Sequence, residues 1–304
     1  MRLEFDPRLI NRVNNHVKHL GIIAGLGRFP FLVADGARQS GHSVTIIGLR
    51  GFADAALSRH ADRFYWAGLA RLGRWIRILK ASGVKSVILA GAVKKSQMYG
   101  RFRLLKTLPD LTSVRLWFFR LRDKRNDSVL SAVADEFARH GITMRSCVEF
   151  TTDHLAPQGV LTKRQPSEAQ SRDADFGWMI AKEMGRLDVG QSVAVKETEV
   201  IAVEAIEGTD GMIERAGQLC PRGGWTLVKV AKPIQDMRFD VPTVGPETIT
   251  KLARHRAAML VIEAGKTVIV DRPEFIASAN RCGLIVVGRS SDVSPSLGAA
   301  PGAS

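Results

Sequence analysis

The stretch that decides the fold is Leu20-Gly21-Ile22-Ile23-Ala24-Gly25-Leu26-Gly27-Arg28-Phe29-Pro30. Its first residues form a short apolar run, typical of a buried strand, and a glycine-rich turn follows. Proline is well suited to the first turn of a helix, so we expect a helix from about Pro30 to Gln39. A second apolar strand is expected at Val44 to Leu49. Strand, helix and strand together predict a βαβ unit with parallel strands.

The same alternation continues through the first half of the chain. Helices are expected over about Leu72–Ser82 and Val129–His140, and strands over Ser86–Ala90 and Thr143–Phe150. Strands that alternate with helices indicate a parallel sheet covered on both faces. We therefore predict an N-terminal Rossmann-like α/β domain over residues 20–151.

The second half is organised differently. Residues 152–172 are rich in Pro, Gln, Ser and Thr, which is typical of a linker. Beyond it we expect a helix near Ala174–Met184, a hairpin over Gln191–Ala205 that turns at Lys196–Thr198, and strands at 225–230, 259–263, 267–270 and 284–288. This pattern predicts a mixed α/β domain over residues 173–289. Residues 1–19 are expected to be an extension outside the fold, and residues 290–304 a disordered tail.

The composition limits the class of protein. The net charge of +14 indicates an anionic partner, which nucleic acid, lipid headgroups or a phosphorylated substrate would each satisfy. Three widely separated cysteines argue against a disulfide framework, and no apolar run is long enough to span a membrane. Met1 to Lys18 contains no apolar signal-peptide core. We therefore expect a cytoplasmic protein.

Gly25 and Gly27 lie between a strand and the start of a helix, where backbone amides and the helix dipole favour a phosphate. The third glycine of a dinucleotide fingerprint is missing, and no Lys-Ser/Thr pair follows as in a P-loop. Two interpretations stay open at this point: a contact with a phosphate or ribose, and a tight structural turn before the helix.

A group of polar residues follows the predicted helix of the second domain. Asp188 and Gln191 precede the hairpin, and Glu204 shares a strand face with Val200 and Ala202, where a charge requires a partner. Gly208-Thr209-Asp210 then reads as a turn before a helix that starts near Gly211. For Asp210, helix capping and an active-site role are weighed equally.

The segment Lys229 to Pro246 combines cations and carboxylates. Pro233, Pro242 and Pro246 favour an extended backbone in the residues before them, and in that geometry Asp236, Arg238 and Asp240 point to the same side. A cation between carboxylates suits a phosphate ester, because cations offset anionic oxygens and carboxylates hold a metal or orient water. The alternative is a surface ladder of ion pairs.

The stretch Arg101 to Arg125 mixes eight basic residues with leucines, Trp117, Phe118 and Phe119. This mixture favours an interfacial segment on anionic lipid. An ordinary amphipathic helix packed on its own domain is the alternative. We expect no nucleic-acid partner, because no helix-turn-helix, zinc finger or RNP-type strand accompanies the basic residues.

Taken together, four segments resemble the LpxI family of UDP-2,3-diacylglucosamine pyrophosphatases, which make lipid X and UMP in lipid A biosynthesis. They are Gly21 to Pro30, Leu187-Asp188-Val189-Gly190-Gln191, Ala202 to Asp210, and Lys232-Pro233 through Pro246. The resemblance implies a metal-dependent hydrolase of two α/β domains with its site in the cleft between them, and an essential catalytic role for Asp240. The chain has Arg125-Asn126-Asp127 where family members usually show Gly-Asp-Asp.

The resulting hypothesis is hydrolysis of the pyrophosphate bond of UDP-2,3-diacylglucosamine at the inner membrane of a Gram-negative bacterium. We expect Mg²⁺ or Mn²⁺, held by carboxylates drawn from Asp188, Glu204, Asp210 and Asp240, with Asp240 and Asp210 as the first choice. The expected catalytic residues are Asp240, Asp210 and Glu204. The expected substrate-binding residues are Gly25, Gly27, Asp188, Gln191, Thr209, Lys229, Lys232, Arg238 and Thr243.

Rival hypotheses differ in class. One is a nucleotide-dependent oxidoreductase or a sugar-nucleotide-modifying enzyme built on the same βαβ unit, against which the missing third glycine counts. The other is a non-enzymatic scaffold that binds membrane or nucleic acid through the basic stretch alone. The sequence leaves a homo-oligomer open.

Overall fold

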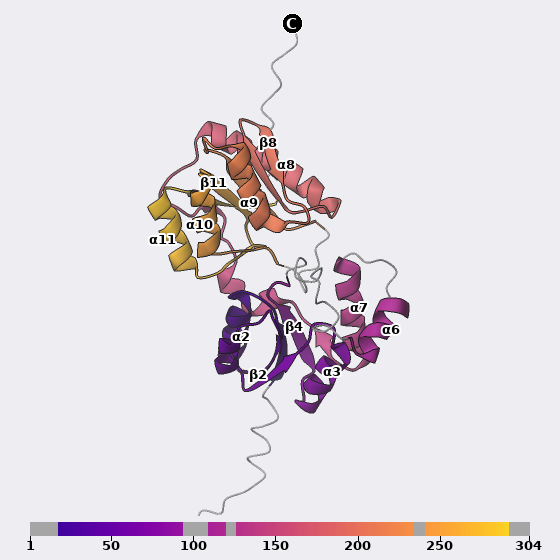
Figure 1. Ribbon diagram of the computed structural model, residues 1–304. Coiled ribbons are helices and arrows are strands. Elements are labelled where there is room, and N and C mark those ends of the chain that lie inside the picture. Colours follow the sequence, from indigo (N-terminus) through magenta and orange to yellow (C-terminus); the bar gives the residue numbers. More distant parts are fainter. Residues whose placement is uncertain (1–17, 94–108, 120–125, 234–240, 292–304) are drawn as a thin grey trace, which may run out of the picture. The chain divides into compact units, whose positions relative to one another are not determined.

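The computed structural model describes residues 18–93, 109–119, 126–233 and 241–291 (Figure 1). The chain divides into two compact units, which meet along the sequence between Thr151 and Thr152. Each unit contains one main β-sheet with helices on both faces.

The first unit is built on a parallel sheet, as predicted; it has five strands, and β3 was not among the predicted ones. The strands lie in the order β3-β2-β1-β4-β5, so the apolar strand of the opening stretch is the central one. Its residues are buried from Leu20 to Ala24, because strands on both sides and helices on both faces exclude water. The strands are β1 (Lys18–Ala24), β2 (His42–Leu49), β3 (Arg63–Ala67), β4 (Ser86–Ala90) and β5 (Thr143–Met144).

Helices cover both faces of this sheet (Figure 1). Helix α2 (Phe29–Gln39) covers one face, and α3 (Leu72–Ala81), α6 (Leu111–Phe119) and α7 (Asn126–Arg139) gather on the other. On that second face Trp75, Leu116 and Phe137 pack against Ile23 and Ile47 in one apolar core. A short 3₁₀ helix, η1 (Ala55–His60), precedes β3.

Three boundaries of the first unit were predicted wrongly. The strand expected over Thr143–Phe150 ends at Met144, and Cys147–Phe150 form the 3₁₀ helix η2, whose first turn is capped by the Ser146 hydroxyl. Helix α7 begins at Asn126, three residues before the expected start. Lys18 and His19 pair with β2 and therefore belong to the fold rather than to an extension.

The second unit is a mixed α/β domain, as predicted, and it is built on a six-stranded mixed sheet. The order is β6-β13-β11-β9-β7-β8, in which β13, β11 and β9 are parallel and the three others run antiparallel to their neighbours. A separate parallel pair joins β10 (Thr243–Val244) and β12 (Val268–Ile269). The sheet strands are β6 (Gly159–Val160), β7 (Ser192–Lys196), β8 (Glu199–Val203), β9 (Thr226–Lys229), β11 (Met259–Glu263) and β13 (Ile285–Arg289).

Helix α8 (Glu168–Arg186) packs on one face of this sheet, where Trp178 and Ala181 meet Val193 and Val228. The other face carries α9 (Gly208–Leu219), α10 (Pro246–Arg254) and α11 (Arg272–Cys282), which bury Met212, Leu252 and Phe275. The predicted hairpin is confirmed: β7 and β8 pair across Glu197 and Thr198.

The segment predicted to be a linker, residues 152–172, is instead an integral part of the second unit. It contains the 3₁₀ helix η3 (Thr152–His154), the edge strand β6 and the first turn of α8. Ser167 and Gln170 form a capping box, with the Ser167 hydroxyl accepting from Gln170 N and the Gln170 side chain accepting from Ser167 N. This Ser-x-x-Gln pattern signals a helix start, and it outweighs the polar composition.

Helix α8 ends in a left-handed residue that is not glycine. Asp188 has φ 57°, and Val189 N donates to Met184 O to close the helix end. Glycine is the usual residue at this position because it carries no Cβ, while Asp and Asn tolerate it best among the other residues.

We predict that Asp188→Asn destabilises the protein less than Asp188→Val does, because both variants lose the ion pair with Lys232 and only asparagine readily adopts the left-handed backbone. The free energy of unfolding of Asp188→Val should lie about 1–3 kcal/mol below that of Asp188→Asn, because a β-branched residue is strained at this φ. Equilibrium urea unfolding of the two variants measures the difference. Equal stability of both would show that the backbone at residue 188 imposes no such restriction.

Candidate functional site

The polar residues of the second unit gather at one edge of its sheet. Strands β9 and β11 end there, and the antiparallel strand β7 begins there. In open α/β sheets ligands bind outside the carboxyl ends of the parallel strands, because loops and helix N-termini converge at that edge. Lys229 and Glu263 end the buried strands β9 and β11, and Ser192 begins β7, so the sheet fixes their positions.

Lys229 is the centre of the cluster on the face covered by α9. It is 8% exposed, and its Nζ donates to the Thr209 hydroxyl at 3.1 Å. The Ser192 hydroxyl lies 3.3 Å from the same Thr209 oxygen, and Ser192 pairs with Lys229 across the two strands. Thr209 stands in the first turn of α9. A cation, two hydroxyls and a helix N-terminus form an arrangement suited to phosphate oxygens.

Glu204 follows β8 at the same edge. It was predicted to share a core-facing side of the strand, and its side chain is indeed buried. Its Oε2 has no hydrogen-bond partner among the described residues. Gly190 permits the arrangement, because a Cβ there would lie 2.1 Å from Glu204 O. The neighbouring Gln191 has its Oε1 buried without a partner as well. Buried acceptors are normally satisfied, so these two oxygens call for a donor or a cation.

Asp210 pairs with a lysine rather than with other carboxylates that could share a metal ion with it. It is in the first turn of α9, where Glu207 occupies the cap position, so the prediction of a helix starting near Gly211 with Asp210 as its cap was wrong. Its carboxylate pairs with Lys251 of α10 and is more than half exposed. A carboxylate in a first helical turn is also stabilised by the helix dipole.

On the other face of the sheet, ion pairs surround the start of the segment after β9. Lys232 pairs with Asp188 at the end of α8, which brings two of the predicted binding residues together. Glu263, at the end of β11, is 0% exposed and accepts from Lys182 Nζ at 2.6 Å and from Lys266 Nζ at 2.9 Å. Sequence reasoning missed Lys182 and Glu263, although an acidic residue that closes the buried run Met259 to Glu263 is a signal.

The ionisation of this buried pair follows from its contacts. Burial raises the pKa of Glu263, but hydrogen bonds from Lys182, Lys266 and the Ser291 hydroxyl outweigh it, so the net pKa lies below the ordinary value. Burial lowers the pKa of Lys182, and its bond to Glu263 offsets part of this effect. Because its hydroxyl donates to Glu263, Ser291 belongs to the folded second unit, although it was expected in the disordered tail.

In the first unit, Gly25 and Gly27 were predicted to contact a phosphate or ribose. The fold itself explains why both residues are glycines. Gly25 N donates to Ala90 O at 2.8 Å, and a Cβ at Gly25 would lie 2.7 Å from Ala92 O. The amide of Gly25 is therefore used by the protein itself, and the residue serves close backbone approach. Gly27 has φ 94° in open space, so glycine is required there by the turn.

The remaining predicted residues are only partly described. Arg238 and Asp240, together with Asp236, lie in residues 234–240, outside the described part of the chain. Thr243 is described, and its hydroxyl donates to Val241 O at 3.0 Å. Within the described ranges, no group of three or more His, Cys, Asp or Glu side chains is arranged to hold a metal ion.

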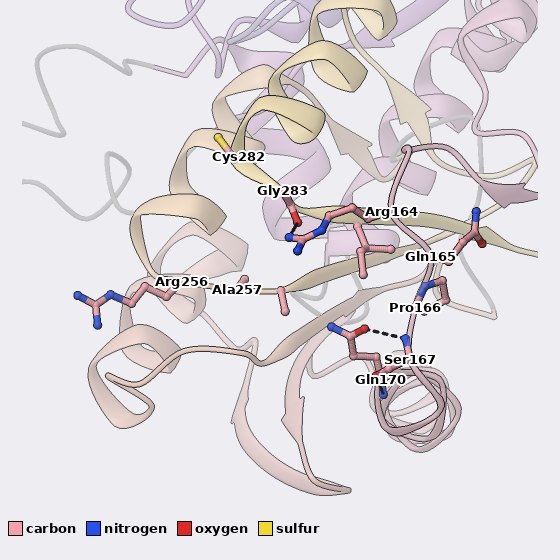
Figure 2. Close-up of a pocket in the computed structure, with 11 residues that line it drawn as sticks. Arg164, Gln165, Pro166, Ser167, Gln170, Arg256, Ala257, Cys282 and Gly283 are labelled. Atoms are coloured by element: carbon pink, nitrogen blue, oxygen red, sulfur yellow. Dashed lines mark hydrogen bonds between the residues drawn. The ribbon is translucent and has the colours of Figure 1, made fainter.

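A cavity of about 420 Å³ lies elsewhere in the second unit (Figure 2). It is lined by residues at the amino ends of β11 and β13, among them Ala258 and Ile285, and by the capping box of α8. Arg164 donates to Gly283 O, while Arg256 extends away from it in Figure 2, so the two cations do not converge. The cavity is therefore separate from the polar cluster at the carboxyl edge. No helix in the described segments combines the length and apolar character needed to cross a bilayer.

Comparison with known proteins covers both units. The model of the LpxI N-terminal domain matches residues 19–154, and the model of the LpxI C-terminal domain matches residues 157–287. The UDP-2,3-diacylglucosamine pyrophosphatase LpxI of Caulobacter vibrioides is 36% identical over 284 residues, which are 90% of this chain and 98% of that protein.

Solved structures resemble the chain only weakly. A biotin carboxylase from Campylobacter jejuni is 12% identical with a TM-score of 0.27, over 69% of this chain and 43% of that one. A nucleoside-diphosphate-sugar epimerase from Pseudomonas aeruginosa is 17% identical with a TM-score of 0.23, over 42% and 50%. Neither likeness bears on the assignment. The two domain models and the full-length relative together show that this chain belongs to the LpxI family.

Proposed function

We propose that this chain hydrolyses the pyrophosphate bond of UDP-2,3-diacylglucosamine, giving 2,3-diacylglucosamine 1-phosphate and UMP in lipid A biosynthesis. The observation that carries the proposal is the 36% identity, across nearly the whole length, to a relative named for this activity. The carboxyl edge of the second sheet supports it independently, because Lys229, Thr209 and the N-terminus of α9 together suit a phosphate group.

In the proposed reaction, a water oxygen forms a bond to one phosphorus and the bond from that phosphorus to the bridging oxygen breaks. Lys229 and Lys232, with Arg238, offset the charge that develops on the phosphate oxygens. Asp240 orients the water or helps hold a metal, and Glu204 supplies a buried carboxylate oxygen that has no hydrogen-bond partner among the described residues. Gln191 offers a second buried acceptor for a substrate hydroxyl or N–H group.

We extend the proposal to Mg²⁺ or Mn²⁺, since hard oxygen ligands fit these ions. The free Oε2 of Glu204 fits such a role, together with Asp240. Asp210 fits it less well, because Lys251 already neutralises its charge. When bound, the metal would polarise a phosphoryl oxygen and lower the pKa of a water.

The assay that tests the function is mass analysis of products after incubation with UDP-2,3-diacylglucosamine, run beside acyl-free UDP-N-acetylglucosamine. We expect UMP and the diacylated sugar phosphate with the first substrate when Mg²⁺ or Mn²⁺ is present. EDTA should abolish the reaction, and added metal should restore it. Undiminished turnover by metal-stripped protein would refute the metal requirement, and no UMP under any condition would refute the function.

Asp240→Ala should lower kcat by about 10² to 10⁴, because loss of a positioned acid–base group or charge stabiliser has this effect. Substrate affinity should change much less, since most binding energy comes from groups remote from the reacting phosphorus. Measuring kcat, Kd and Tm beside Asp236→Ala separates this role from a structural one. A folded Asp240→Ala protein with wild-type kcat would contradict it.

A peripheral association with the cytoplasmic face of the inner membrane forms part of the proposal. The substrate carries two acyl chains, and helix α6 exposes Leu111, Trp117 and Phe118 beside Arg115. Exposed aromatic residues next to cations are typical of a surface that binds anionic lipid.

Changing Trp117 and Phe118 to Ser should weaken sedimentation with anionic liposomes by about tenfold or more, because burial of each large apolar side chain contributes about 1.5–3 kcal/mol. The control changes Ile206 and Leu219, two exposed apolar residues of the second unit, to Ser. If the control weakens binding as much as the α6 variant, α6 has no special role at the membrane.

A further inference from the structure

Ala231 is held on both sides of its backbone by one buried ion pair. Glu263 Oε2 accepts from Ala231 N at 2.8 Å, and Lys182 Nζ donates to Ala231 O at 3.1 Å. The same Glu263 oxygen accepts from Lys182 Nζ at 2.6 Å, so the three groups form a closed ring of hydrogen bonds.

Lys182 itself has little freedom to move. Its Nζ lies 5.2 Å from the centre of the Trp178 ring, one turn back on α8, and Arg289 lies 5.0 Å from the same ring. Arg289 in turn pairs with Asp175. Cations placed over an aromatic ring are stabilised electrostatically, and more strongly so where water is excluded.

Helix α8 also contacts the next two residues directly. A Cβ at Gly185 would lie 3.1 Å from Lys232 Cα and 3.1 Å from Pro233 Cδ, so the helix backbone and the segment are in close contact. The ring at Ala231 and this contact together fix the backbone between Lys229 and Lys232. These are the two described cations that the proposed function places on the phosphate oxygens.

We infer that the buried Lys182–Glu263 pair positions Lys229 and Lys232 for the reaction through its grip on Ala231, and is not only a stabilising ion pair. The inference rests on the proposed function for the role of the two lysines. A buried ion pair costs desolvation energy and is weak support for stability by itself, which favours a positional role. Lys182 and Glu263 touch neither phosphate nor water in this scheme and are positioning residues.

The chain offers a matched pair of variants. Lys182 and Lys266 both donate to Glu263, but only Lys182 contacts Ala231. Lys182→Met should lower kcat for UDP-2,3-diacylglucosamine by about 10- to 100-fold, as loss of a supporting contact does at a preorganised site, with Kd nearly unchanged. Lys266→Met should leave kcat within about twofold of the wild type, since a partly exposed ion pair contributes little. A purely structural pair would lower Tm in both variants and leave turnover per folded molecule intact.

Should Lys182→Met fail to fold, the double variant Lys182→Met/Glu263→Gln removes both charges, which proteins often tolerate, and still deletes the donor to Ala231 O. Amide hydrogen exchange of peptides covering residues 226–233 gives a readout that needs no activity. We expect faster exchange in the Lys182 variants and wild-type exchange in Lys266→Met.

The outcomes separate the inference from the function. Wild-type kcat in the folded Lys182 variants, or unchanged exchange at residues 226–233, overturns the positioning role. An inactive wild-type protein whose Lys182 variants exchange faster refutes the proposed function while the grip on Ala231 stands.

Discussion

The carboxylate of Glu263 is withdrawn completely from water, and this constraint organises the carboxyl edge of the second sheet. An ionised group in such a place is stable only when donors surround it, and here two lysines, a serine hydroxyl and a backbone amide do so. Those donors come from α8, from the segments after β9 and β11, and from the residues after β13. One buried charge thereby ties together four parts of the chain that are distant in sequence.

The two faces of this sheet edge differ in what they leave unsatisfied. On the α8 face, the side chain of Glu263 has partners for both of its oxygens. On the α9 face, one buried oxygen of Glu204 has no partner within the part of the chain that the structure describes. A satisfied network gives rigidity, whereas an unsatisfied buried acceptor costs free energy until a ligand arrives. This difference favours a ligand on the α9 face, where the proposed function places the phosphate near Lys229.

Much of the fold could be predicted from the sequence, because apolar runs and turn residues are local signals. The stretch from Leu20 to Pro30 predicts the central strand and first helix of the parallel sheet, and the hairpin around Glu197 is equally legible. Composition misled where a cap decided the outcome, as at Ser167. Some polar residues at the carboxyl ends of the strands, such as Glu204 and Lys229, could be singled out from the sequence, but the contacts between side chains could not. Lys182 and Glu263 lie 81 residues apart, and no periodicity in the sequence indicates such a contact.

The edge strand β6 opens the second unit along the chain yet pairs with β13, its last strand. Val160 and Val287, which lie opposite each other, are therefore made at very different times during translation. The first unit has every strand of its sheet once Met144 has left the ribosome, whereas the second must wait for Arg289. Until then β11 has an unpaired edge, and unpaired edges of this kind can pair with other chains, so the partly made second unit is more exposed to aggregation than the first.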